Sequence, residues 1–386
     1  MRLSHRRVSA GCMLLLSLAL TGCGKGNARF FQGGPPPPPS TEFLYGSTLV
    51  GVVATEQIDT TSGALSIAAQ TSGSNGTSII ASSSGGFLYA VDPSAMGVDG
   101  YSVASSGAIS AIGGSPFAAS GAAGGLQAVA IDSTGKYLYA IGATASGGSG
   151  TGVVVAYSIN TTTGALTLLS GSPFAAGKSP VALAADPKGP FLYVSDSTIG
   201  VLGFSISSSG ALTPITMSPP AAGGLDMAIT PNGTYLYSVD DASLVSAYSI
   251  NSTTGVLKAV AGSPFSFQAG SGLVASKVIV DPLGRFVYAY NTVGNPSTIA
   301  GFTINSGTGV LTAVSGSPFT AGSVTVAVAS LAIEPTGKYL YASCGGGNCG
   351  ILGFSMNAST GALTQLTGSP FNSQVTIGSM TTVLIQ

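Results

Sequence analysis

The chain has 386 residues and a formal net charge of −1, and only 6% of its residues are charged, against roughly a quarter in typical globular proteins. The exposed surface must therefore consist mostly of Ser, Thr, Gly and Asn. No basic patch is available for a nucleic acid, so we exclude nucleic-acid binding.

Residues 1–22 are predicted to be an export signal. Arg2, Arg6 and Arg7 precede an apolar stretch, 13–20, which is shorter than the roughly 18 residues that a membrane-spanning helix needs. The sequence Leu20-Thr21-Gly22-Cys23 resembles the bacterial lipobox, whose Cys becomes the lipid-modified first residue. We therefore expect a lipoprotein of the cell envelope, on the outer membrane or facing the periplasm. An ordinary signal peptide with a chance Cys is the alternative.

Residues 23–40 are predicted to be a tether. Five consecutive prolines, Pro35 to Pro39, favour an extended polyproline segment that rises about 3.1 Å per residue. Such a segment would hold the following domain away from the membrane. Without residues 1–22 the chain has nine Lys and Arg against thirteen Asp and Glu, a formal net charge of −4.

Residues 41–386 consist of one repeated unit, which is clearest at 328–371. This stretch contains four short apolar runs, at 330–333, 339–343, 351–356 and 362–366. Runs of this length, bounded by Gly, Pro and Asn, are typical of strands rather than helices. The unit is therefore predicted to be a four-stranded antiparallel meander.

Two markers recur seven times along the chain. The first is an aromatic-aliphatic-Tyr triplet, ending at Tyr45, Tyr89, Tyr139, Tyr193, Tyr237, Tyr288 and Tyr341. The second is a Gly followed by a small and then a larger aliphatic residue, beginning at Gly63, Gly107, Gly164, Gly210, Gly255, Gly309 and Gly361. Four strands per repeat at this period predict an all-β fold, a seven-bladed β-propeller of four-stranded antiparallel blades. These strands are shorter than the about nine to eleven residues that a transmembrane barrel requires.

The two ends of the repeat region are complementary. The first triplet, at Phe43, has no apolar run before it, whereas an extra run, 380–385, follows the seventh copy. We predict that this C-terminal run is the innermost strand of the first blade and closes the ring, which removes the free strand edges. We expect a monomer.

Candidate site residues are sought on one face of the ring. In a propeller, ligands usually bind where second strands turn into third strands and where fourth strands cross to the next blade. The candidates on that face are Asp92, Asp99, Asp196, Asp240, Asp241, Lys178, Lys277 and Asn291. The recurring carboxylates are interpreted first as turn caps, with a shared Ca²⁺ site as the alternative. The Asn residue suits a glycan, peptide or protein ligand.

Two further motifs have structural interpretations. Gly-Ser-Pro-Phe occurs at 114–117, 171–174, 262–265, 316–319 and 368–371. We place it on the ligand face as a corner in which Pro stiffens the crossing and Phe fills the space between blades. An aromatic platform for a ligand is the alternative. Cys344 and Cys349 flank a Gly-rich loop and are predicted to form a disulfide in an oxidising compartment. No metal site is predicted at these cysteines, because such a site would need more ligands and residues 23–386 contain no His.

The amino-acid sequence of the repeat resembles that of a known family. Asp186-Pro187-Lys188-Gly189-Pro190-Phe191-Leu192-Tyr193-Val194, with Gly171-Ser172-Pro173-Phe174, is similar to the seven-bladed lactonase family. That family includes propeller-type 6-phosphogluconolactonases and carboxymuconate-cyclising enzymes, and it borders on the YVTN repeat propellers. The resemblance covers about residues 41–386 and implies the fold of that family. We predict no cofactor, with the Ca²⁺ site above as the alternative.

The side chains that the resemblance implies for catalysis are missing. The related enzymes are expected to use His, Glu and Arg around the channel, whereas Arg285 and Glu334 fall at turns on the opposite face. Two functions from different classes follow. The main interpretation is a lipid-anchored propeller that binds a partner or glycan without catalysis. The alternative is a hydrolase of the 6-phosphogluconolactonase type that acts on a sugar lactone.

Overall fold

The computed structural model describes residues 41–48, 50–73, 76–144, 150–217, 221, 223–240, 244–266, 275–291, 297–321, 328–344 and 350–385. The predicted export signal, 1–22, the tether, 23–40, and Cys23 lie outside these residues. The described part of the chain forms strands and turns, and it includes no helix long and apolar enough to span a membrane.

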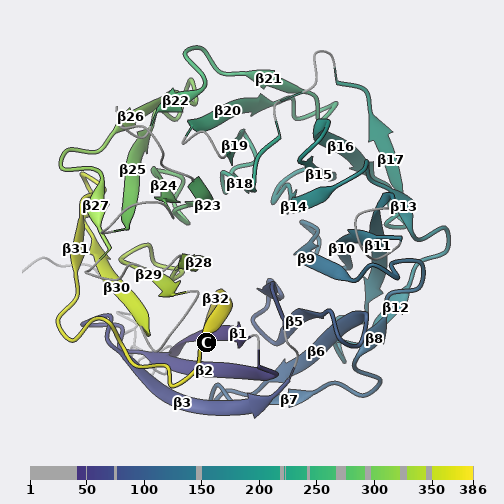
Figure 1. Cartoon of the computed structure of the whole chain (residues 1–386), viewed down its shortest axis with the longest axis horizontal. Coiled ribbons are helices and arrows are strands. Elements are labelled where there is room, and N and C mark those ends of the chain that lie inside the picture. Colours follow the sequence, from purple (N-terminus) through teal and green to yellow (C-terminus); the bar gives the residue numbers. More distant parts are fainter. Residues whose placement is uncertain are drawn as a thin grey trace, which may run out of the picture. The chain divides into compact units, whose positions relative to one another are not determined.

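Seven antiparallel sheets are arranged around a central axis as the blades of a propeller (Figure 1). Blade 1 is β32 (Ile377–Ile385), β1 (Thr41–Thr48), β2 (Val52–Ile58) and β3 (Leu65–Ser72), from the axis outward. Blade 2 is β4 (Ile79–Ala81), β5 (Phe87–Asp92), β6 (Gly97–Val103) and β7 (Ile109–Ala111), with β8 (Phe117–Ala118) beside β6. Blade 3 is β9 (Leu126–Ile131), β10 (Tyr137–Ala143), β11 (Gly152–Ile159) and β12 (Leu166–Leu168), with β13 (Phe174–Ala175) beside β11.

The remaining four blades repeat this order. Blade 4 is β14 (Pro180–Ala185), β15 (Phe191–Asp196), β16 (Gly200–Ile206) and β17 (Leu212–Ile215). Blade 5 is β18 (Asp226–Ile229), β19 (Tyr235–Val239), β20 (Leu244–Ile250) and β21 (Leu257–Ala259), with β22 (Phe265–Ser266). Blade 6 is β23 (Ala275–Val280), β24 (Phe286–Asn291), β25 (Thr298–Ile304) and β26 (Leu311–Ala313), with β27 (Phe319–Thr320). Blade 7 is β28 (Val328–Ile333), β29 (Tyr339–Cys344), β30 (Ile351–Met356) and β31 (Leu363–Gln365).

The predicted closure of the ring is confirmed. β32 pairs antiparallel with β1 over its whole length, from Thr41↔Ile385 to Thr48↔Ile377. The last residues of the propeller therefore provide the innermost strand of the first blade (Figure 1). Because blades 1 and 7 then pack as the other neighbours do, no blade face remains unpaired.

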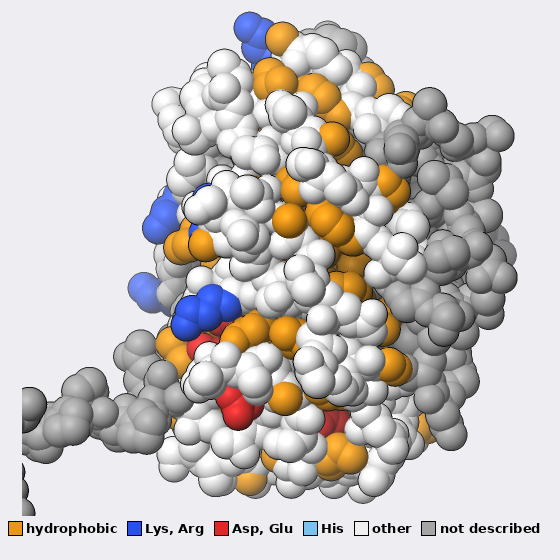
Figure 2. All heavy atoms as spheres, turned by 90° about the vertical axis from the view of Figure 1, so that its left-hand side faces the viewer, with side chains coloured by type: hydrophobic (Ala, Val, Ile, Leu, Met, Phe, Trp, Pro, Cys, Tyr) orange, Lys and Arg blue, Asp and Glu red, His pale blue; other side chains and the backbone are white. Residues whose placement is uncertain are grey.

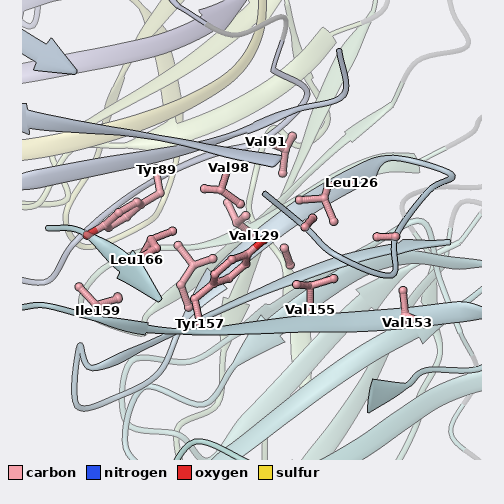
Figure 3. Close-up of a cluster of buried hydrophobic side chains, with 14 of the residues drawn as sticks. Tyr89, Val91, Val98, Leu126, Val129, Val153, Val155, Tyr157, Ile159 and Leu166 are labelled. Carbon is pink, nitrogen blue, oxygen red and sulfur yellow. The ribbon is translucent and has the colours of Figure 1, made fainter. Parts of the chain in front are cut away.

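Apolar side chains fill the space between neighbouring blades. Between blades 2 and 3, Tyr89, Val98, Val129, Val155 and Tyr157 are buried in one cluster (Figure 3). Each blade is a sheet with two faces to bury, and a ring supplies a neighbour for each face.

The two sequence markers meet across every blade boundary. In each case the triplet Tyr donates its hydroxyl hydrogen to the carbonyl oxygen of the marker Gly in the following blade, at 2.7–3.0 Å. The last of these bonds, from Tyr341 to Gly63, joins blade 7 to blade 1. The marker Gly has a positive φ, as at Gly107 (79°), and a Cβ there would lie 2.3 Å from the Phe43 ring. The positive φ and the lack of room for a Cβ both explain why Gly recurs at this position.

The predicted position of the Gly-Ser-Pro-Phe motif is wrong. The motif lies along the outer edge of the blade, where the fourth strand bends and resumes as a two-residue strand beside the third, as β7 and β8 do against β6. The fourth strand is therefore interrupted before the chain reaches the ligand face. The structural role of the motif is confirmed, because Phe117 packs against the cluster between blades 2 and 3. The degenerate copy at 218–220 lies outside the described residues.

Candidate functional site

The innermost strands surround a small polar channel. A cavity of about 190 Å³ is lined by residues from all seven blades, close to where the innermost strands begin. This is the end that faces the predicted ligand face, because the crossings from the preceding blades arrive there. Sites for drug-sized ligands have about 300–1,000 Å³, so the cavity suits a smaller molecule.

One equivalent position in each blade supplies a side chain to the channel. The position is defined by the pairing of the innermost strand with the second strand. It is the residue just before the one that pairs with the residue after the triplet Tyr. Examples of that pairing are Ile79↔Ala90 and Val278↔Ala289. Around the ring the position holds Ser78, Ala128, Ala182, Asp226, Lys277, Ser330 and Ser379, all of which line the cavity. We call these seven residues the channel ring.

Several members of the channel ring hold neighbouring blades together. Ser379 accepts the backbone N–H of Ile79 at 3.2 Å, and Ser78 accepts that of Val129 at 3.3 Å. Ser330 accepts the N–H of Met380 at 3.0 Å. In the same way, Oδ2 of Asp226 accepts the N–H of Val278 at 3.0 Å. The ring geometry therefore fixes the orientation of these side chains.

Asp226 and Lys277 occupy adjacent positions of the channel ring, in blades 5 and 6. Burial raises the pKa of Asp226, although the Lys277 ammonium and the N–H groups of Val278 and Met227 pull it down. A carboxylate with a raised pKa is a stronger base than an exposed one. Among the described residues that line the channel, these two are the only charged ones.

The structure places the other predicted candidates differently. Asp196, at the end of β15, is fully buried and accepts the backbone N–H groups of Lys178, Ser179 and Thr198 at 2.6–2.8 Å. Burial raises its pKa, but the hydrogen bond from the Thr198 hydroxyl and these backbone hydrogen bonds together outweigh burial, so the net shift is downward. The Lys178 side chain is exposed. Asp196 therefore stabilises a loop, and it does not line the channel.

Two further aspartates accept backbone N–H groups a few residues ahead in the chain. Asp92 accepts the N–H groups of Ser94 and Ala95 at 2.8 and 3.0 Å, and Asp240 accepts that of Leu244 at 3.1 Å. Asp99 does not lie in a loop, which corrects its predicted position. It is buried within β6, where it accepts the hydroxyl hydrogen of Tyr101 at 3.0 Å.

Several predictions fall outside the described residues. These are Asp241, Cys349 and the side chains of Asn291 and Cys344, of which only the backbone is described at the ends of β24 and β29. In the described part of the chain, no three His, Cys, Asp or Glu residues lie together as a metal site would need.

Sequence reasoning found Lys277 and missed Asp226. The signal was nevertheless present, because Asp226 begins the run Asp-Met-Ala-Ile just as Lys277 begins Lys-Val-Ile-Val in the next repeat. A charged residue at the start of the apolar run of an innermost strand marks the channel ring. The candidates in loops were preferred because loops commonly carry function.

The closed ring and its polar channel define a seven-bladed propeller with one small axial site. The family model described as "Lactonase, 7-bladed beta-propeller" matches residues 118–215 and 204–378, which is more than half of the chain. The chain therefore belongs to the seven-bladed β-propeller lactonase family. A comparison with curated proteins found no match.

Solved structures share the fold at low sequence identity. A candidate 6-phosphogluconolactonase of Bacteroides uniformis is 20% identical with a TM-score of 0.70, over 89% of this chain and 99% of the other. A second one, from Bacteroides fragilis, is 18% identical with a TM-score of 0.70, over 91% and 99%. The periplasmic gluconolactonase of Pseudomonas aeruginosa is 14% identical with a TM-score of 0.69, over 90% and 99%.

Proposed function

We propose that this protein is a lactone hydrolase whose site is the axial channel. Asp226 is the base that takes a proton from water, and Lys277 stabilises the negative charge that develops on the lactone carbonyl oxygen. Water adds to the carbonyl carbon, the ring C–O bond breaks, and the proton passes to the departing ring oxygen. The product is an open-chain hydroxy acid. The observation that carries this proposal is the adjacent placement of these two charged residues in the channel ring.

The proposed substrate is an uncharged lactone about the size of a monosaccharide. A phosphorylated sugar needs Arg or Lys groups around its phosphate, and Lys277 is the only cation among the described channel residues. If Lys277 contacts the carbonyl oxygen, no described cation is left for a phosphate. Family membership and the structural likeness to a gluconolactonase support the choice of a lactone.

The test is an assay of residues 41–386, which contain all seven blades, against gluconolactone at several pH values. We expect Asp226→Asn to reduce kcat/KM about 10²–10⁴-fold, as loss of a general base does, while the amide oxygen still accepts the Val278 N–H. Asp92→Asn, in a turn away from the channel, is the control and should retain activity. In the wild type, activity should rise with pH above the usual range for Asp, because burial raises the pKa of Asp226.

A binding module without catalysis is the second candidate. The observation that favours it is the small number of charged side chains, two, among the described channel residues. No turnover of gluconolactone or its 6-phosphate, together with a specific glycan or peptide ligand, would contradict the hydrolase and support this module.

We propose an exported, lipid-anchored protein. The support is the basic and apolar leader ending at Cys23, together with the periplasmic location named for the Pseudomonas relative of the same fold. Labelling with a fatty acid should modify the wild type and fail with Cys23→Ser. Labelling that persists in the variant would refute the anchor.

A further inference from the structure

All three glutamates of the chain, Glu42, Glu56 and Glu334, lie where the ring closes. Glu42 and Glu56 belong to β1 and β2 of blade 1, and Glu334 follows β28 of blade 7. All three are buried, with exposed fractions of 3%, 2% and 0%. We call the contact between blades 1 and 7 the closing interface.

Burial is the main cause that raises the pKa of Glu42, and the nearby carboxyl group of Glu334 raises it further. Glu334 already accepts the N–H groups of Thr336 and Tyr339, at 2.6 and 3.0 Å, together with the Thr336 hydroxyl and the Lys338 N–H. Glu334 thus accepts from four donors of residues 336–339, whereas an ionised Glu42 would place a second negative charge beside it.

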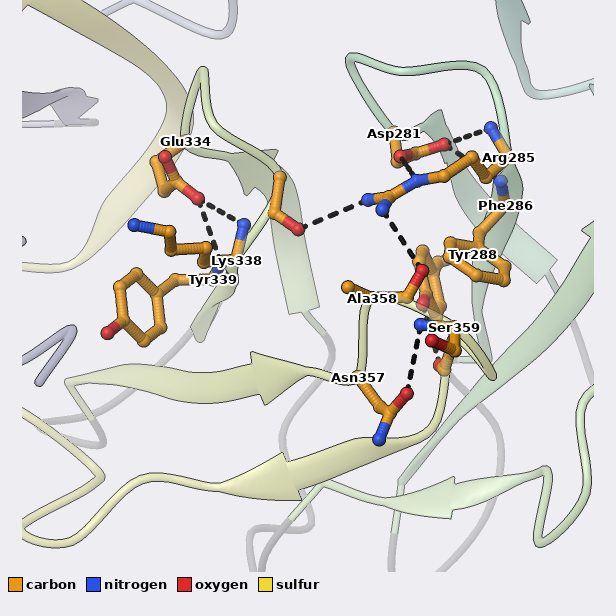
Figure 4. Close-up of polar contacts among 12 residues, drawn as sticks. Asp281, Arg285, Phe286, Tyr288, Glu334, Lys338, Tyr339, Asn357, Ala358 and Ser359 are labelled. Atoms are coloured by element: carbon orange, nitrogen blue, oxygen red, sulfur yellow. Dashed lines mark hydrogen bonds and ion pairs between the residues drawn. The ribbon is translucent and has the colours of Figure 1, made fainter. Parts of the chain in front are cut away.

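The same position holds a cation at the preceding blade boundary. Arg285 stands directly before its triplet as Glu42 does, pairs with Asp281 at 2.8 Å, and donates to the carbonyl oxygens of Gly337 and Ala358 in blade 7 (Figure 4). Figure 4 also shows Glu334 accepting from the backbone of Lys338 and Tyr339. The boundary between blades 6 and 7 is thus held by the Arg285 guanidinium, which donates to backbone carbonyl oxygens of blade 7, whereas the closing interface brings two carboxyl groups together.

Glu56 replaces an aromatic residue. It opposes Leu44, and the residues that oppose the corresponding aliphatic of the other triplets are Tyr101, Tyr157, Phe204, Tyr248, Phe302 and Phe354. Leu44 packs in a cluster with Tyr341 and Ile351 of blade 7, and directly opposed residues share a face of the sheet. Glu56 therefore points into this apolar interface, where its Oε1 has no hydrogen-bond partner among the described residues.

We propose that the closing interface is a pH-sensitive switch, in which protonated Glu42 and Glu56 hold blades 1 and 7 together and their ionisation loosens this contact. Ionised Glu42 would place two negative charges against each other, and ionised Glu56 would leave an unpaired charge among apolar side chains. Loosening would act first on β32 and β1, the strands that close the ring.

The surroundings of Glu42 and Glu56 raise the pKa of both side chains. Burial is the largest influence and raises the pKa of both Glu42 and Glu56 to about 7; Glu334 raises that of Glu42 further, and only Lys338 lowers it. The ionisable groups that interact around Glu42 are Asp59, Glu334, Lys338, Tyr339 and Tyr341.

The direction of the pH effect follows from linkage. The pKa of each Glu is raised from 4.5 in the free side chain to about 7 in the fold. The unfolded chain therefore releases these protons at lower pH than the folded chain does. The contribution of Glu42 and Glu56 to stability is fully present below about pH 4.5 and falls as the pH rises towards 7. Above pH 7 this contribution is lost.

The experiment measures the urea midpoint of the full chain at pH 5 and pH 8 for the wild type and for the double variant Glu42→Gln, Glu56→Gln. We expect the wild-type midpoint to be lower at pH 8 and the double variant to lose most of this difference. Gln keeps the size of the side chain and stays uncharged at both pH values. Asp186→Asn, which removes one buried carboxyl group from a turn of blade 4, is the control and should keep the wild-type difference.

A second measurement localises the effect, because Asp226 also has a raised pKa and shifts stability in the same direction. Hydrogen exchange at pH 8 should be about tenfold or more faster in β32 and β1 of the wild type than of the double variant, since one pKa unit corresponds to a tenfold change in equilibrium. β15 in blade 4 should exchange equally in both proteins. Equal exchange of β32 in the two proteins, or an equal change in β15, would overturn the proposal.

Discussion

Single side chains repeat the same task in different blades. The Ser of each intact Gly-Ser-Pro-Phe motif accepts a backbone N–H from the third strand of its own blade at 2.8–3.0 Å, as Ser317 does from Gly301. This bond satisfies a donor that the interrupted fourth strand leaves without a partner. The side chain of the motif Phe lies against the same residue, with the Phe319 ring 3.1 Å from where a Cβ of Gly301 would be.

Replacing Ser317 by Ala should therefore lower the free energy of unfolding by about 1–3 kcal/mol, the usual effect of leaving a partly buried donor unpaired. Urea denaturation would measure it. Ser315→Ala, an exposed position two residues earlier, is the control and should change stability little. A Ser317 effect no larger than that of Ser315 would contradict this role.

Sequence reasoning at the residue scale succeeded for turns, but in the channel it found Lys277 and missed Asp226. The capping by Asp92 and Asp196 depends on neighbours within a few residues, and such local hydrogen bonds can be inferred from the chain. The role of Asp226 depends on Lys277 and Val278 in the next blade. That relation exists only once the blades are placed around an axis.

At the scale of the element, each blade is bonded to the next through a Tyr hydroxyl and a Gly carbonyl. Tyr193 in β15 is fully buried, and its hydroxyl lies 2.7 Å from the carbonyl oxygen of Gly255. Both markers were visible in the sequence as separate repeats. Their pairing was not, because the two partners are 62 residues apart.

Tyr193→Phe should lower the free energy of unfolding by about 1–3 kcal/mol, because a buried carbonyl loses its donor while the ring remains. The matched control is Tyr137→Phe, which removes an exposed hydroxyl bond to the carbonyl oxygen of Ser208. Water replaces that bond, so its effect should be smaller. Thermal and urea unfolding of both variants test this, and equal losses would refute it.

At the scale of the whole molecule, closure by β32 decides whether the seven blades behave as one unit. β32 supplies the innermost strand of blade 1 and contributes Ser379 to the channel ring. Its removal exposes an edge of β1 and takes away Ile377 and Met380, which pack against blade 7. The outer surface, by contrast, is mostly uncharged and polar on the side drawn in Figure 2.

Deletion of residues 377–386 should therefore abolish cooperative unfolding, and exposed apolar surface should cause aggregation. Adding the peptide 377–386 in excess should restore part of the folded signal in circular dichroism. A truncated protein that unfolds in one transition at the wild-type midpoint would contradict the role of β32.

The sequence alone determined the number of blades, the order of their strands and the closing strand. These features follow from local periodicity, turn residues and a repeat, all of which involve residues that are close together in the sequence. Only the tertiary structure decided that Asp226 meets Lys277, that the Gly-Ser-Pro-Phe motif runs along the outer edge, and that three glutamates gather between blades 1 and 7. These contacts join residues from different strands and blades, and only the geometry of the closed ring brings such residues together.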